Sequence, residues 1–125
     1  MQSPNYLNDI EAEITFLTSE EGGHKGPVYS GYRPQFYYDG NDWDAVQNYV
    51  GVFEVYPGQT VTTQLSFLSP QCHFGRLYPG KEFLIREGQR VVAHGKVTKI
   101  LDLEKSAMEA EAREAKRRGK NNGAV

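Results

Sequence analysis

Short segments of alternating apolar and polar residues run from residue 10 to residue 101, with turn sequences between them. Every second residue is apolar in 10–16, and the same alternation recurs in 60–67, which is typical of half-buried antiparallel strands. The turn sequence Tyr-Pro-Gly occurs at 56–58 and again at 78–80. Because about six strands follow one another without an intervening helical pattern, the sequence predicts an all-β fold, either a small barrel or a sandwich.

The segment 31–38, Gly-Tyr-Arg-Pro-Gln-Phe-Tyr-Tyr, is rich in aromatic and polar residues. Pro34 favours an extended conformation at Arg33, and the aromatic residues after it favour a strand that begins at Gln35. Arg33 and Gln35 would then lie at the entrance of the strand, where a guanidinium and an amide suit recognition of carboxylate, phosphate or backbone oxygens. Taken alone, this segment favours the structural alternative, in which Arg33 binds loop carbonyls and the strand fills a core.

The composition predicts one soluble domain. The 125 residues carry a formal net charge of -2, which does not indicate a nucleic-acid or membrane surface for the whole chain. Cys72 is the only cysteine, so no internal disulfide can form, and the neighbouring His73 has no second pair that would complete a zinc spacing. Because neither a secretory signal nor a membrane-spanning segment is evident, we expect a cytoplasmic protein.

We expect no catalytic residues, metal or cofactor. The sequence lacks the phosphate-binding pattern Gly-x-x-x-x-Gly-Lys-Ser/Thr and a nucleophile–base pair at a recognisable spacing. The glycine-rich segment 19–27 contains His24 and Lys25, which would meet a phosphate as simple donors, or the segment would be a flexible, solvated loop.

Residues 102–118 are rich in helix-forming residues, with acidic side chains leading and basic side chains following. The pairs Glu109/Arg113 and Glu114/Arg118 would stabilise this helix. Its apolar face consists mostly of alanine, so we expect a loosely attached helix whose deletion would leave the melting temperature nearly unchanged. The favoured interpretation is a solvated appendage; the alternative is contact with RNA phosphates through the basic residues Arg113, Lys116, Arg117, Arg118 and Lys120.

Segments at 20–23, 31–37, 57–58, 85–88 and 97–101 together resemble the C-terminal β-barrel, domain III, of elongation factor Tu. The resemblance covers residues 10–101, with 1–9 as a lead-in and 102–125 as a charged helical tail. It implies a six-stranded antiparallel closed barrel followed by a short C-terminal helix. No GTPase domain accompanies this barrel, and the chain begins with Met1, so we expect a standalone protein.

In that family, domain III packs against the GTPase domain, touches the T arm of aminoacyl-tRNA and contributes to binding the nucleotide-exchange factor. The resemblance therefore implies a partner-binding or RNA-binding surface formed by His24, Lys25, Arg33, Gln35, Arg86 and Glu87. It also implies that His94 and Gly95 belong to a surface that resembles the interface with the GTPase domain.

Several positions depart from the family pattern. Asp39 and Ser69 stand where the family often has basic residues, His94 replaces a small residue, and residues 74–81 look like an insertion. The loss of two basic positions predicts weak RNA binding. We therefore expect a noncatalytic module that engages a protein partner of the translation machinery, as a mimic or competitor. The alternative is a tRNA- or RNA-binding barrel that acts with a separate GTPase chain; neither interpretation involves a membrane or a bound nucleotide.

Overall fold

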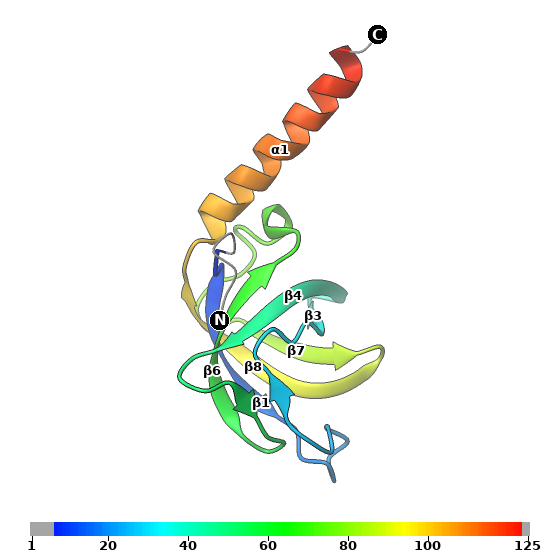
Figure 1. Ribbon diagram of the computed structural model, residues 1–125, viewed down its shortest axis with the longest axis vertical. Helices are drawn as coiled ribbons and strands as arrows, with labels where there is room; N and C mark the ends of the chain where they lie inside the picture. Colours follow the sequence, from blue (N-terminus) through cyan, green and yellow to red (C-terminus); the bar gives the residue numbers. More distant parts are fainter. Residues whose placement is uncertain (1–6, 124–125) are drawn as a thin grey trace.

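The protein was analysed as a computed structural model, which describes residues 7–123 and the side chains of residues 7–119. Within this part of the chain, six strands close into the antiparallel barrel that the sequence predicts (Figure 1). The order around the barrel is β1-β6-β4-β3-β7-β8, with β8 pairing back to β1. The strands are β1 (Ile10–Phe16), β3 (Gln35–Tyr38), β4 (Asn41–Tyr49), β6 (Thr60–Phe67), β7 (Glu82–Glu87) and β8 (Arg90–Ile100).

Three short elements lie outside this barrel. Strands β2 (Val28–Tyr29) and β5 (Glu54–Val55) pair with each other, and β2 was not predicted from the sequence. A 3-10 turn, η1 (Pro70–Cys72), follows β6. These elements are too short for an alternating pattern to reveal them.

The barrel interior is filled by the apolar residues that alternate along the strands. The ring of Phe36 stacks on that of Phe83 with 4.2 Å between their centroids, and its edge meets Phe67 at 5.0 Å. Ile14 and Leu65 are completely buried beside this cluster. Burying each such side chain contributes about 1.5–3 kcal/mol to folding, so the period-two pattern is what closes the barrel.

A hairpin of two residues connects β3 and β4. Asp39 and Gly40 have φ angles of 49° and 84°, and Tyr38 pairs directly with Asn41. Positive φ at both central residues is the geometry of a type I′ turn, which Asp-Gly favours. The turn therefore consists of Asp39 and Gly40 alone, and β4 begins at Asn41.

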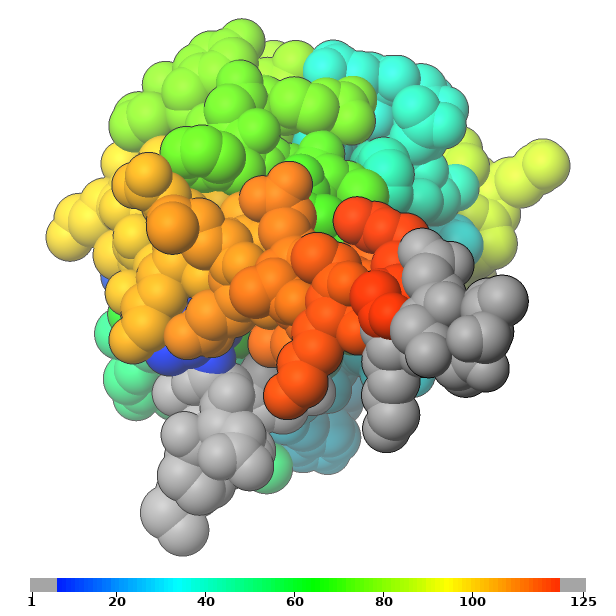
Figure 2. Space-filling model, turned by 90° about the horizontal axis from the view of Figure 1, so that it is seen from above, coloured from blue at the N-terminus to red at the C-terminus, as the bar shows by residue number. Residues whose placement is uncertain are grey.

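The chain ends in α1 (Leu103–Gly123), a helix of 21 residues that is longer than predicted and extends away from the barrel (Figure 1). Its first turns lie beside η1 (Figure 2). Leu103, Ser106, Ala107 and Ala110 are buried, and Ser106 donates a hydrogen bond of 2.5 Å to the buried carboxylate of Asp9. The expectation of loose attachment was wrong for these two turns, because it considered only the helix's alanines and not the polar contact.

No helix in the described part of the chain is both long and apolar enough to cross a membrane. Residues 1–6 of the expected lead-in lie outside the described residues.

Candidate functional site

The glycine-rich loop after β1 is ordered and presents His24 and Lys25 at one end of the barrel. The backbone N–H of Gly23 donates to the carbonyl of Thr18 at 2.9 Å. A side chain at Gly23 would collide with the carbonyl of Leu17, so this close approach requires glycine. The loop holds His24 half-buried and leaves Lys25 exposed.

Glu87, at the end of β7, accepts hydrogen bonds from three elements. Its carboxylate lies 2.7 Å from His24 Nε2, accepts a short hydrogen bond from the Tyr32 hydroxyl, and lies 3.4 Å from a guanidinium nitrogen of Arg90. Burial alone would raise the pKa of this carboxyl, but the hydrogen bonds from Tyr32 and His24 hold the pKa below its ordinary value. Burial and the neighbouring carboxylate raise the pKa of Tyr32, so its hydroxyl stays protonated and donates.

Gln35 and Arg86 lie directly opposite each other on β3 and β7. Arg86 forms a two-pronged ion pair with Asp42, with distances of 3.1 Å and 2.6 Å between guanidinium nitrogens and carboxylate oxygens. The same guanidinium lies 4.2 Å from the centroid of the Tyr37 ring. Arg86 is therefore held by two neighbours on the outer face of the sheet, and it has few donors left for a ligand.

The predicted partner-binding residues come together around the end of β7, and we call this surface the rim. Arg33 and Lys25 are exposed, and neither forms a hydrogen bond or ion pair with another described side chain. The amide oxygen of Gln35 is buried and has no hydrogen-bond partner among the described residues. The rim consists of His24, Lys25, Arg33, Gln35, Arg86 and Glu87.

Sequence reasoning did not identify three residues that organise the rim. Tyr32 belongs to the aromatic segment 31–38, from which a site role was predicted only for Arg33 and Gln35. Asp42 and Arg90 lie outside the segments from which site residues were predicted. No local sequence signal pairs Asp42 with Arg86, because only the register of the closed sheet places Asp42 opposite Tyr37 and Arg86 opposite the nearby Gln35.

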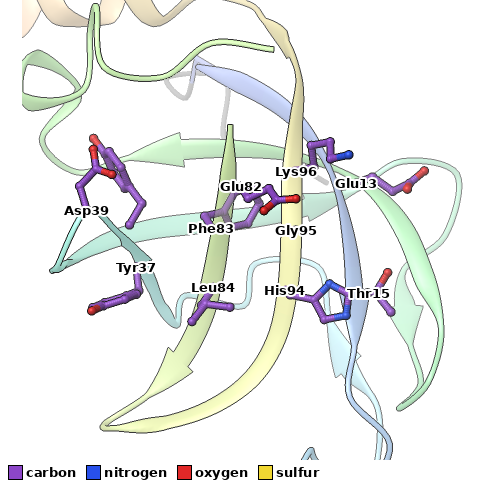
Figure 3. Close-up of a pocket in the computed structure, with 11 residues that line it drawn as sticks. Glu13, Thr15, Tyr37, Asp39, Glu82, Phe83, Leu84, His94, Gly95 and Lys96 are labelled. Atoms are coloured by element: carbon purple, nitrogen blue, oxygen red, sulfur yellow. The ribbon is translucent and has the colours of Figure 1, made fainter. Parts of the chain in front are cut away.

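An open groove of about 660 Å³ lies on the outer face of the barrel across β1, β8, β7 and β3 (Figure 3). His94 points outward beside Thr15 of the neighbouring strand, and Lys96 lies near Glu13 (Figure 3). Gly95 contributes backbone to the floor of this groove, but the position of its absent side chain faces Phe83, which a Cβ atom would overlap. Only His94 of the two predicted surface residues can therefore contact a partner through its side chain.

Lys116, Arg117 and Arg118 lie on the exposed second half of α1, whereas Arg113 borders a small pocket that the helix forms with barrel residues such as Asp9 and Ser66. Arg118 pairs with Glu114 at 2.9 Å, as predicted, whereas the expected pair between Glu109 and Arg113 is not formed. Arg113, Lys116 and Arg117 are exposed and have no ion pair among the described side chains. The side chain of Lys120 lies outside the described residues.

Cys72 and His73 do not form part of a metal centre in this fold. His73 is completely buried, its Nδ1 lies 2.7 Å from the Tyr38 hydroxyl, and its ring stacks on Phe67. Burial, with the nearby charge of Arg76, lowers the pKa of His73 to about 4, so the imidazole is neutral at physiological pH. Among the described residues, no group of three or more His, Cys, Asp and Glu side chains could hold a metal ion.

A protein-family model described as the elongation factor Tu C-terminal domain matches residues 3–101. The match covers well over half of the chain and includes every strand of the barrel. The rim and the groove both lie inside the matched region, whereas α1 lies outside it.

Proposed function

Because the chain belongs to the family of elongation factor Tu C-terminal domains, we propose that its barrel is a noncatalytic module that engages a protein partner of the translation machinery through the rim. Membership of the family suggests a role related to translation, and in elongation factor Tu this domain is a noncatalytic barrel. A partner that recognises domain III of elongation factor Tu would meet a similar surface here, so the chain would act as a mimic or competitor in the cytoplasm.

The main support for this proposal is that two cationic side chains of the rim are already paired with carboxylates of the same chain. Arg86 is held by Asp42, and His24 contacts Glu87, so neither side chain is free to neutralise a phosphate. Lys25 and Arg33 are therefore the rim cations that remain able to contact a phosphate. Two phosphate contacts would give a slope of only about -1.8 for log affinity against log salt, compared with the many contacts of strong nucleic-acid binders.

The surroundings of Arg33 favour a protein ligand instead. Arg33 is exposed between Tyr32 and the buried Pro34, and the loop and strand hold both neighbours in place. Arginine and tyrosine are enriched among the residues that dominate the binding energy of protein interfaces, and Arg33 is exposed next to Tyr32 in the chain. On the outer face, His94 stands in the groove, so a partner bound there must accommodate an imidazole.

The test is an affinity capture of partners from cell lysate, with and without nuclease. We expect nuclease-resistant capture by the wild type, strong loss with Arg33→Ala and little loss with Lys25→Ala. Arg33→Lys keeps the charge but removes the planar fork, so it should restore only part of the binding. Circular dichroism of each variant checks that the barrel is folded.

The RNA interpretation predicts a different pattern. Submicromolar binding of tRNA by the wild type, with a steep dependence on salt and loss in Lys25→Ala, would contradict the proposal. Capture that disappears on nuclease treatment would do the same.

A further inference from the structure

The barrel exposes neighbouring apolar side chains on the loop that follows β4 and on the strand β2. Tyr29, Val50, Val52 and Phe53 each have between 47% and 62% of their surface exposed. The ring centroids of Tyr29 and Phe53 lie 5.7 Å apart, so the two segments form one surface, which we call the apolar patch. Single exposed apolar residues are common in soluble proteins, whereas a group of neighbouring ones marks an interaction site.

Backbone hydrogen bonds hold the apolar patch in place. The N–H of Ser30 donates to the carbonyl of Phe53 at 2.8 Å, and the N–H of Val50 donates to the carbonyl of Thr62 at 2.9 Å. Between Val50 and Phe53 the chain turns at Gly51, whose φ of 82° favours glycine. A partner would therefore meet a preformed surface, and binding would lose little free energy to the ordering of a loop.

The loop 50–53 forms a ridge between two grooves. Val50 and Val52 line both grooves, which have volumes of about 540 and 370 Å³. Phe53 lines the larger groove, whose other walls are uncharged: Ser30, Gly31, Asn48, Tyr49 and Gln64. Among the described residues that line the two grooves, Glu54 is the only one that carries a charge, and it lies in the smaller groove. An apolar centre with polar, uncharged surroundings is typical of homodimer interfaces.

We propose that the chain forms a symmetric dimer in which the ridge of each copy packs into the larger groove of the other. The ridge and the groove belong to the same surface, which is what a twofold contact requires, because both copies use the same patch. A different protein would usually be selected by charges around the apolar centre, and the larger groove has none among its described lining residues. The formal net charge of -2 also opposes association only weakly.

The area of the contact is consistent with ridge-into-groove packing. Each partner in a stable complex buries about 800 Å². The exposed parts of Tyr29 and Phe53 offer about 200 Å², so the apolar patch alone is too small and the groove walls have to enter the contact. Insertion of the ridge adds these walls on both copies. The dimer goes beyond the function proposed above, because the apolar patch shares no residue with the rim.

Sedimentation equilibrium of the full chain, from low to high micromolar concentration, measures the dissociation constant of the dimer. A reducing agent is present because Cys72 is a free thiol. Phe53→Asp should raise the dissociation constant by about 100-fold, because a tenfold loss arises at each of two symmetric positions. Val52→Asp, on the same ridge, should act in the same direction. Both side chains are at least half exposed, so the barrel should remain folded, which circular dichroism checks.

Phe74→Asp is the matched control, because Phe74 is 50% exposed and lies outside the apolar patch and both grooves. It should leave the dissociation constant unchanged. Arg33→Ala should also leave it unchanged, which separates the dimer from the function of the rim. Hydrogen exchange of the wild type requires no substitution: the amides of residues 50–53 should exchange more slowly at concentrations where the dimer forms.

Several outcomes would overturn the proposal. One is a wild-type chain that stays monomeric at every concentration, and another is an equal loss of the dimer with either control variant. A dimer that dissociates as the salt concentration rises would also overturn it, because an uncharged contact is not screened by salt. A monomer that captures a different protein through Phe53 would assign the apolar patch to that protein instead.

Discussion

At the residue scale, Asp9 is an acidic side chain that the fold buries almost completely, with 2% of its surface exposed. One carboxylate oxygen accepts from the backbone N–H of Phe67 at 2.8 Å and the other accepts from Ser106. Burial raises the pKa of Asp9, the two hydrogen bonds partly oppose this effect, and the charge of Asp102 adds to it. The folded state therefore binds a proton here more readily than the unfolded state does.

The contribution of Asp9 to the free energy of unfolding depends on pH. Asp9 contributes most stability below its ordinary pKa of 3.8, and that contribution is lost as the pH rises through the higher pKa of the folded state. Asp9→Asn keeps both contacts, since its amide oxygen accepts from Phe67 and its NH₂ donates to Ser106. We expect the variant to match the wild type below pH 3.8 and to have the higher free energy of unfolding at neutral pH.

The measurement is urea denaturation of both proteins across the acidic range. Asp9→Ala is the control, because it leaves the Phe67 N–H unpaired and should destabilise the fold by about 1–3 kcal/mol. A difference between Asp9→Asn and the wild type that grows as the pH falls would refute the assigned direction.

At the scale of elements, α1 combines a structural half and an exposed half. Leu103 is 1% exposed, and burying a leucine contributes about 1.5–3 kcal/mol. The hydrogen bond from Ser106 adds about 0.5–1.5 kcal/mol. The side chains from residue 111 to residue 119 add little, because they are nearly all exposed.

Two truncations separate the halves. A chain that ends at residue 111 should keep its free energy of unfolding within about 0.5 kcal/mol of the wild type. A chain that ends at residue 102 should lose about 2–4 kcal/mol, because it uncovers the surface under Leu103 and leaves Asp9 without Ser106. Thermal and urea denaturation would measure both values. Equal stability of the two truncated chains would show that the packed turns contribute nothing, as the sequence alone had suggested.

At the scale of the whole molecule, the start of α1 is surrounded by acidic side chains. The α-helix of the described chain begins at Leu103, directly after Asp102, and its first turn bonds to the carboxylate of Asp9. A helix start surrounded by carboxylates repels phosphate, whereas nucleotide-binding helices present free N–H groups.

We therefore expect that the isolated chain neither binds nor hydrolyses GTP. Calorimetric titration of GTP with magnesium into micromolar protein should show no heat beyond dilution. A GTPase with an intact phosphate-binding loop, measured in the same buffer, is the positive control. A saturable binding isotherm would contradict the expectation and would require a site that the described residues do not suggest.

The sequence by itself determined the strands of the barrel. Period-two alternation forces the apolar residues of 10–16 and 60–67 onto one face, and a short chain can bury such faces together by closing the sheet. The segment around Arg33 also predicted that β3 begins at Gln35, because a proline there is followed by aromatic residues. The dipeptide Asp39-Gly40 is itself a signal for the two-residue hairpin that the structure contains.

Tertiary structure alone decided which cations remain free. Arg86 and Asp42 are 44 positions apart, and His24 and Glu87 are 63 apart, so only the closure of the barrel brings them into contact. The attachment of α1 was decided in the same way, because Ser106 and Asp9 meet across 97 positions. The alternation of residues along a segment predicts which face of the sheet a side chain occupies. Contacts between distant side chains depend instead on strand register and on the path of the loops, which no short segment specifies.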